Sequence, residues 1–260
     1  MSFKIGWFST GRDQAAIDLF ETISKAIRNG TTKGEVAFVF SNRIRGEAVE
    51  SERFFDVVEG YGIPLIQFSS KNFKPDRIAF DREVMKRLEG YDPALVVLAG
   101  YMLIVGPEMC RKYRMINLHP ALPDGPVGTW EEVIWKLVHA KATETGAMMH
   151  LVTPELDKGP PISYYSFPIR GEEFDALWEK EDKQELFDEI RRQGVIRELP
   201  LILFTIREFT DGNLTIQNGK VLARGKRLEK GYDLTKQIEQ WITKRGQATF
   251  ILLQNTENKK

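Results

Sequence analysis

Short apolar runs alternate with longer amphipathic stretches through the first half of the chain. Runs with the length and composition of β-strands occur at Lys4–Phe8, Val36–Phe40, Pro64–Phe68, Leu95–Leu98 and Ile116–Leu118. Between them, apolar residues recur at helical spacing, which predicts helices over Gln14–Ile27, Glu47–Glu59, Asp76–Leu88 and Gly106–Tyr113. Strands separated by helices favour right-handed crossovers. We therefore expect an α/β protein with a mostly parallel twisted sheet and helices on both faces.

The second half of the chain is less regular. Strands are predicted at Met148–Val152 and Ile162–Phe167, and a charged helical stretch at Leu177–Phe204, in which Pro200 predicts a break or kink. Asn218-Gly219 between two short apolar runs is typical of a hairpin turn. A last helix is predicted at Leu234–Thr243. We expect one main domain over residues 1–209, with a hairpin, helix and tail over 210–260 packed on it; the apolar segment Ala248–Leu253 should be covered.

Composition narrows the class of protein. Lys plus Arg and Asp plus Glu each number 37 in 260 residues, so the formal net charge is zero. A neutral chain gives no sign of nucleic-acid or membrane binding, although a local basic patch stays open. The single cysteine, Cys110, excludes an internal disulfide and offers no metal-binding spacing. No stretch resembles a signal peptide or membrane span. We expect a cytoplasmic protein.

One of the three histidines occupies a position suited to chemistry. His119 follows an apolar strand and opens a loop rich in proline, at the sheet edge where open α/β folds bind ligands. Asn117 lies two residues earlier on an extended chain, so both side chains should point the same way. An amide donor and a titratable imidazole would then converge. His139 is interpreted as a solvated helix residue, and His150, between apolar neighbours on a strand, as a structural histidine.

Two further segments carry polar groups with an open interpretation. The loop Thr153–Pro161 contains the carboxylates of Glu155 and Asp157, and by itself is typical of a solvated turn. The turn Ser9–Asp13 lies between the first strand and the first helix, where backbone N–H groups and Arg12 could hold an anion. Asp13 can equally cap the helix.

Taken together, these segments resemble the folate-dependent formyltransferases. The resemblance rests on Asn117-Leu118-His119-Pro120 followed by Glu155-Leu156-Asp157 and Gly159-Pro160, with support from Phe80-Asp81-Arg82-Glu83, Leu98–Met102 and Gly231-Tyr232-Asp233. It covers about residues 4–243 and is strongest for the branch that formylates glycinamide ribonucleotide in purine synthesis. It implies a Rossmann-like formyltransferase fold and 10-formyltetrahydrofolate as the formyl donor, with no metal.

The resemblance also implies roles for individual residues. Asn117 would donate to the formyl oxygen, a protonated His119 would stabilise the developing oxyanion, and Asp157 would pair with His119 and assist proton movement. The folate would contact the segments Met102, Leu103, Ile104, Val105 and Thr153, Glu155, Leu156, Asp157. The acceptor would contact Gly11, Arg12, Asp13, Arg77, Met102 and Pro120, with its phosphate near Gly11 to Asp13. The binding partners would be small molecules, and a homodimer stays open.

Several positions depart from the family pattern. Arg12 and Asp13 stand where serine and asparagine are usual in the phosphate loop, and a carboxylate beside a phosphate is unfavourable. The loop after His119 is one residue short and runs into Trp130-Glu131-Glu132. Leu103 replaces an arginine, and Val195 falls where an acceptor-binding glutamate is expected, with Arg197 and Glu198 close by. These changes bear on the acceptor rather than on the chemistry.

Three alternatives to glycinamide ribonucleotide formylation stay open on the sequence. The acceptor could be another amine, such as an amino-sugar nucleotide, which fits the altered phosphate loop. A methionyl-tRNA acceptor would normally require a basic C-terminal domain. The chain could also bind folate without transferring the formyl group, or transfer it to water.

Overall fold

The computed structural model describes residues 2–73 and 76–244, so the predicted segment Ala248–Leu253 lies outside it. Its eight-stranded sheet has the order β11-β7-β6-β5-β4-β1-β2-β3. These strands span β1 Lys4–Phe8, β2 Glu35–Ser41, β3 Leu65–Gln67, β4 Leu95–Leu98, β5 Met115–His119, β6 Glu144–Leu151, β7 Pro161–Pro168 and β11 Tyr232–Asp233. The strand β6 pairs antiparallel with both neighbours and the other pairs are parallel. The expected mostly parallel sheet is confirmed.

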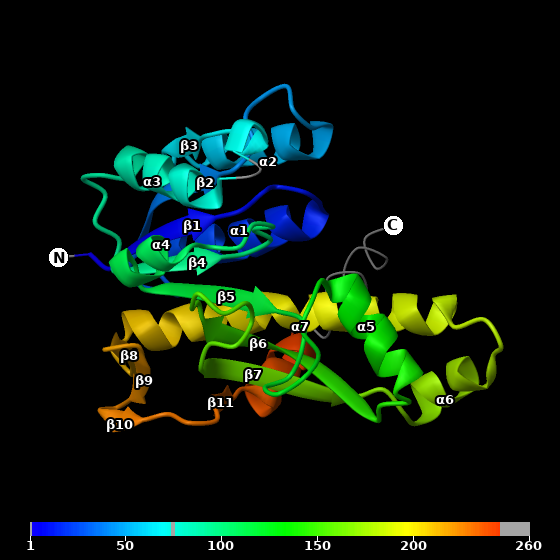
Figure 1. Cartoon of the computed structure of the whole chain (residues 1–260). Coiled ribbons are helices and arrows are strands. Elements are labelled where there is room, and N and C mark those ends of the chain that lie inside the picture. The colour runs from blue at the N-terminus through cyan, green and yellow to red at the C-terminus, as the bar shows by residue number, and fades with distance from the viewer. Residues whose placement is uncertain (1, 74–75, 245–260) are drawn as a thin grey trace, which may run out of the picture.

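Helices cover both faces of this sheet, as predicted (Figure 1). They span α1 Gln14–Arg28, α2 Val49–Gly60, α3 Arg77–Arg87, α4 Pro107–Lys112, α5 Trp130–His139, α6 Glu172–Glu179 and α7 Gln184–Thr210, with a short 3-10 turn at Lys71–Phe73. Alternate residues of β1 divide between two cores: Trp7 packs with α1, α2 and α7, whereas Phe8 packs with α3 and α4. A strand buried on both faces explains the continuous apolar run in the sequence. None of the described helices combines the length and hydropathy needed to cross a bilayer.

The long helical stretch differs from its prediction. Residues 180–183 separate α6 from α7, and α7 then continues through Pro200 without ending. A proline in a helix interior costs about 3 kcal/mol or more through a lost hydrogen bond and a steric clash. Buried side chains on both sides of it, including Ile190 and Leu201 to Leu203, pack into the main core and hold the helix in place.

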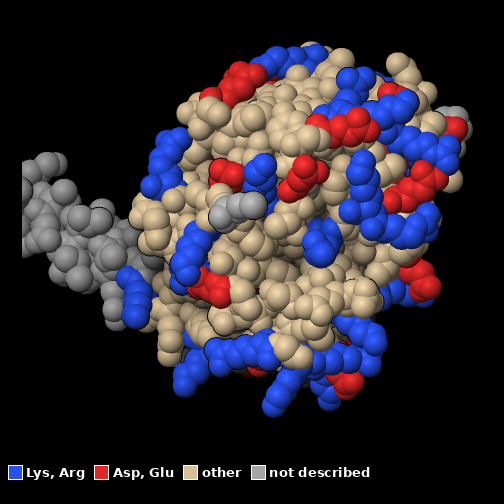
Figure 2. All heavy atoms as spheres, turned by 90° about the vertical axis from the view of Figure 1, so that its left-hand side faces the viewer, with Lys and Arg blue, Asp and Glu red and all other residues tan. Residues whose placement is uncertain are grey.

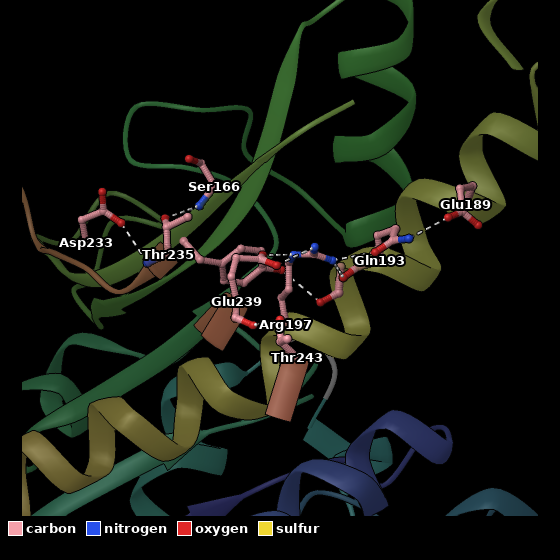
Figure 3. Close-up of polar contacts among 10 residues, drawn as sticks. Ser166, Glu189, Gln193, Arg197, Asp233, Thr235, Glu239 and Thr243 are labelled. Carbon is pink, nitrogen blue, oxygen red and sulfur yellow. Dashed lines mark hydrogen bonds and ion pairs between the residues drawn. The ribbon is translucent and has the colours of Figure 1, made fainter. Parts of the chain in front are cut away.

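The C-terminal part contains the predicted hairpin and helix. The strands β8 Leu214–Gln217, β9 Lys220–Ala223 and β10 Lys226–Arg227 form a small antiparallel sheet. Its turn has φ of 50° at Asn218 and 70° at Gly219. Both residues are thus in the left-handed conformation that an Asn-Gly hairpin turn requires, as the sequence predicts. A helix follows over residues 235–244, the last that the structure describes. An ion pair joins this helix to α7: Nε of Arg197 in α7 lies 2.6 Å from Oε1 of Glu239 in the last helix (Figure 3). The domain boundary at residue 209 stays a prediction.

Basic side chains gather at the hairpin end of the molecule. Figure 2 shows Lys and Arg along the lower edge of the face that carries the hairpin. Exposed cations there are Lys220, Arg224, Lys226, Arg227 and Lys230. The neutral net charge therefore conceals a local basic patch, and its residues do not line the cavity described next.

Candidate active site

A cavity of about 370 Å³ opens at the carboxyl ends of β1, β4 and β5. Its walls come from the start of α1, the loop after β4, the end of β5, the loop after β6, and residues of α5 and α7. Of the predicted site residues, all within the described part of the chain, twelve line it: Arg12, Asp13, Met102, Leu103, Ile104, Val105, Asn117, His119, Pro120, Thr153, Leu156 and Asp157. Gly11, Glu155 and Arg77 do not. The cavity lies at the sheet edge expected for this class of fold.

The three predicted catalytic side chains line this cavity together. Nδ1 of His119 lies 3.6 Å from Oδ2 of Asp157, and both side chains are less than a tenth exposed. Asn117, which precedes His119 on the same face of β5, lines the cavity beside them. The loop Thr153–Pro161 is therefore not a merely solvated turn, because it brings a carboxylate to the imidazole.

The loop after β5 fixes the ring of His119. Nε2 of His119 lies 3.0 Å from the carbonyl oxygen of Pro126. A carbonyl can only accept, so Nε2 carries a proton and Nδ1 is the nitrogen free to exchange one with Asp157 or a reactant. The loop ends in a capping box, in which Thr129 and Glu132 bond each other's backbone N–H and start α5. The shortened loop thus has a defined structure that orients the imidazole.

The backbone around Asp157 is unusual and tightly held. Asp157 has φ of 54°, a left-handed conformation that aspartate and asparagine adopt more readily than most residues. Two residues later, a Cβ added to Gly159 would lie 1.6 Å from the carbonyl oxygen of Leu151. Only glycine allows the loop to return this close to β6, and this return carries Asp157 to the histidine.

One end of the cavity has an apolar rim suited to a flat heterocycle. Three large apolar side chains that are more than two-fifths exposed gather there, Met102, Ile104 and Leu156. Exposed apolar groups around a concave site are typical of a ligand surface. Glu155 of the same loop is highly exposed and points away into solvent, 4.0 Å from Lys158.

Another part of the cavity wall comes from the turn Ser9–Asp13, which was predicted to bind a phosphate. The side chain of Asp13 accepts from the backbone N–H of Ala16 at 3.0 Å and so caps α1. Nε of Arg12 lies 3.8 Å from the same carboxylate. The N-terminus of α1, which could hold a ligand anion, is therefore already faced by a carboxylate of the chain itself. Gly11 has φ of 64° and lies against Phe54, where a side chain would clash.

Arg77 was expected to reach the acceptor phosphate, and the structure gives it another role. Its Nε donates to the carbonyl oxygen of Ile104 at 2.6 Å, and its Nη2 lies 2.7 Å from Asp81 and 3.1 Å from the hydroxyl of Tyr101. Asp81 in turn accepts from the N–H of Gly106. Arg77 thus fixes the loop after β4 and does not line the cavity.

His150 belongs to the site, although the sequence favoured a structural role for it alone. It pairs with Asn117 across β5 and β6 and is buried. Its Nε2 lies 3.1 Å from Nδ2 of Asn117 and 3.6 Å from Oδ1 of Asp157. Each carboxylate oxygen of Asp157 thus faces one histidine. The antiparallel direction of β6 creates this contact, and recognising it from sequence would have required that strand register.

Three more lining residues were not predicted as site residues, and they form one wall near the start of α1. Nη1 of Arg191 lies 2.9 Å from Oε1 of Glu198, and its guanidinium covers the Trp130 ring at 4.5 Å from the centroid. Burial raises the pKa of the Glu198 carboxyl above its usual value, and Arg191 opposes this rise. Glu198 thus places a late-helix carboxylate on the cavity wall, three residues after Val195. Arg197, next to it, faces the other way and binds Glu239 (Figure 3).

Comparison with known proteins identifies the family. Residues 14–186, about two thirds of the chain, match the formyl transferase family. The chain belongs to this family. The resemblance seen in the motifs is confirmed. Other members of the family match this chain over most of its length.

Three of these relatives illustrate the range. Phosphoribosylglycinamide formyltransferase of Schizosaccharomyces pombe is 34% identical over 177 residues, covering 62% of this chain and 82% of that protein. The enzyme of the same name from Escherichia coli is 29% identical over 220 residues, covering 82% and 92%. The structure of phosphoribosylglycinamide formyltransferase from Coxiella burnetii in complex with CHES has a TM-score of 0.72 at 27% identity, covering 90% of this chain and 99% of that one.

Proposed function

We propose that the protein transfers a formyl group from 10-formyltetrahydrofolate to the primary amine of glycinamide ribonucleotide. The observation that carries this proposal is the meeting of Asn117, His119 and Asp157 in one cavity of a formyl transferase. The apolar rim of Met102, Ile104 and Leu156 supports a folate at one end. The acceptor is supported by the names of the relatives over most of the chain.

The reaction follows from the charges that develop. When a neutral amine attacks the formyl carbon, negative charge appears on the formyl oxygen and positive charge on the nitrogen. Asn117 would donate to that oxygen, and His119 would donate from Nδ1, because its Nε2 proton is held by Pro126. Each such preorganised donor can contribute about 3–4 kcal/mol. Asp157 balances the charge of the imidazolium and helps remove the proton from the amine.

One observation favours a second acceptor class. The cap that Asp13 makes on α1 puts a carboxylate where a terminal phosphate would otherwise bind. An amino-sugar nucleotide, whose phosphates are internal and could bind elsewhere, avoids this repulsion. It uses the same chemistry at the same three residues.

The function is tested by formyl transfer from 10-formyltetrahydrofolate to glycinamide ribonucleotide, followed as release of tetrahydrofolate. We expect turnover that the His119→Ala variant lacks. Turnover with an amino-sugar nucleotide but not with glycinamide ribonucleotide would select the second acceptor class. Tight folate binding without transfer to either amine would reject the enzymatic proposal.

Glu198 is expected to contribute to acceptor binding. Its carboxylate is held by Arg191 at the acceptor end and can accept from acceptor hydroxyl groups. Because a hydrogen bond to a charged group is worth about 1.5–3 kcal/mol, Glu198→Gln should raise the KM for the acceptor about 10-fold or more. The KM for the folate should stay the same.

Steady-state kinetics with each substrate varied in turn measure this difference. Glu189→Gln is a matched control, because Glu189 is also an α7 carboxylate paired with an arginine, Arg192, and does not line the cavity. An unchanged acceptor KM in Glu198→Gln would contradict the assignment.

A further inference from the structure

The hydrogen bonds of His150 define its protonation state. Nδ1 of His150 lies 3.1 Å from the carbonyl oxygen of Leu151, so this nitrogen must carry a proton. Nε2 lies 3.1 Å from the amide nitrogen of Asn117, which can only donate. Nε2 therefore accepts, and the ring is the neutral tautomer with its proton on Nδ1.

This contact decides which end of the Asn117 amide faces which neighbour. An amide side chain can turn by half a rotation and exchange its oxygen for its nitrogen at little steric cost. With Nε2 of His150 as an acceptor, the nitrogen end is held next to the histidine. The same nitrogen has a second N–H, and Asn117 lines the cavity, so this N–H is available to the formyl oxygen.

We infer that His150 is a positioning residue for formyl transfer, which in its neutral form holds the donor end of the Asn117 amide toward the formyl group and loses this hold when Nε2 takes up a proton. The inference rests on the function proposed above. A protonated Nε2 would face the Asn117 amide nitrogen donor to donor. It would turn instead to Oδ1 of Asp157, 3.6 Å away, and would compete with His119 for that carboxylate.

The surroundings of His150 support a neutral ring at physiological pH. Burial lowers its pKa below the usual value for histidine, and the neighbouring His119 lowers it further, whereas the Leu151 carbonyl and Asp157 raise it. Among the described residues, the titratable groups that face the ring are His119 from the end of β5 and Asp157 from the loop after β6. Because the pKa is lowered, the ring is neutral at and above the ordinary histidine range. The protonated, misorienting form appears only as the pH falls below it.

Activity measurements separate positioning from a structural role. His150→Leu, which removes the acceptor, should lower kcat about 10- to 100-fold, by analogy with the loss when the partner that orients a metal-binding histidine is removed. The KM values should change little. His150→Gln restores an acceptor near the position of Nε2 but does not titrate in this range, so it should keep kcat within about 3-fold of the wild type near pH 8, a far smaller loss than an orienting group gives when removed.

Two comparisons decide the result. In an Asn117→Ala background, His150→Leu should cause almost no further loss, because there is no amide left to orient. The ratio of His150→Gln to wild-type kcat should rise as the pH falls, because only the wild type loses its acceptor. The same loss from His150→Leu in both backgrounds, or a pH-independent ratio, would overturn the inference.

A spectroscopic readout does not depend on the acceptor. The chain has only three histidines, so their imidazole nitrogens can be assigned by NMR with single-residue variants. We expect His150 as the neutral form protonated on Nδ1 down to a pH below the usual histidine range. A ring protonated on Nε2 would require the oxygen of Asn117 to face it, and would overturn the inference even if the transfer reaction were established. The opposite combination is also informative. If NMR shows the expected tautomer but the protein formylates neither amine, the orientation of the Asn117 amide by His150 is supported and only the proposed function is rejected.

Discussion

Replacing Asp157 with asparagine is expected to lower kcat about 10³-fold, within the range of about 10²–10⁴ that a positioned acid or base contributes. The side chain is almost isosteric, and asparagine tolerates the φ of 54° at this position, so the backbone should be preserved. What is lost is the negative charge 3.6 Å from Nδ1 of His119. Without it the imidazolium is no longer balanced, and the proton leaving the amine has no nearby base.

Single-turnover and steady-state kinetics at saturating substrates measure this loss, and urea unfolding checks the fold. Glu155→Gln is the matched control: it removes a carboxylate two residues away on the same loop, exposed and outside the cavity. It should keep nearly full activity. If Asp157→Asn kept more than about a tenth of the wild-type kcat, the loss would lie below the range for acid–base catalysis and the role of Asp157 would be wrong.

The fold could be predicted because its local signals agree with the global arrangement. Runs such as Leu95–Leu98 lack polar alternation, and in the structure this strand is buried on both faces. The start of α1 could also be recognised, since Asp13 caps it with its side chain. The direction of β6 could not be predicted, because strand pairing is decided by contacts between distant segments rather than by local periodicity.

The same limit explains which site residues could be found. Asn117 and His119 lie two residues apart, so local geometry alone places them together. Asp157 required the family motif, because a loop carboxylate carries no sign of its partner. His150 and Glu198 reach the cavity only through the antiparallel register of β6 and the packing of α7. Both look like ordinary core or helix residues in the sequence.

Arg77 illustrates the opposite case, a predicted site residue whose side chain binds other parts of the chain. A free cation near a proposed phosphate site was an attractive partner, but a guanidinium has five donors and binds whichever acceptors it can reach. In the structure the nearest acceptors are the Ile104 carbonyl, the Tyr101 hydroxyl and Asp81. The sequence shows that Arg77 is a cation in need of a hydrogen-bond partner. Only the tertiary structure shows that other residues of the chain are that partner.

Asn117→Ala is expected to lower kcat about 10²- to 10³-fold, the loss found when one donor to a developing oxyanion is removed. Asn117→Asp should be at least as damaging, because a carboxylate of the same shape cannot donate and places a negative charge beside the oxyanion. In both variants the KM for the folate should change little, since its proposed apolar contacts, Met102, Ile104 and Leu156, lie on other loops than Asn117.

Rapid-quench measurement of the transfer step tests this expectation, with Asn213→Ala as a control for loss of an amide side chain outside the cavity. The order of the two Asn117 variants carries the most information. If Asn117 only filled space, the aspartate variant, which keeps the volume, would be the more active of the two. If it acts as a donor, the aspartate variant is no better than alanine, because the reaction needs an N–H that faces the negative charge developing on the formyl oxygen rather than a filled volume.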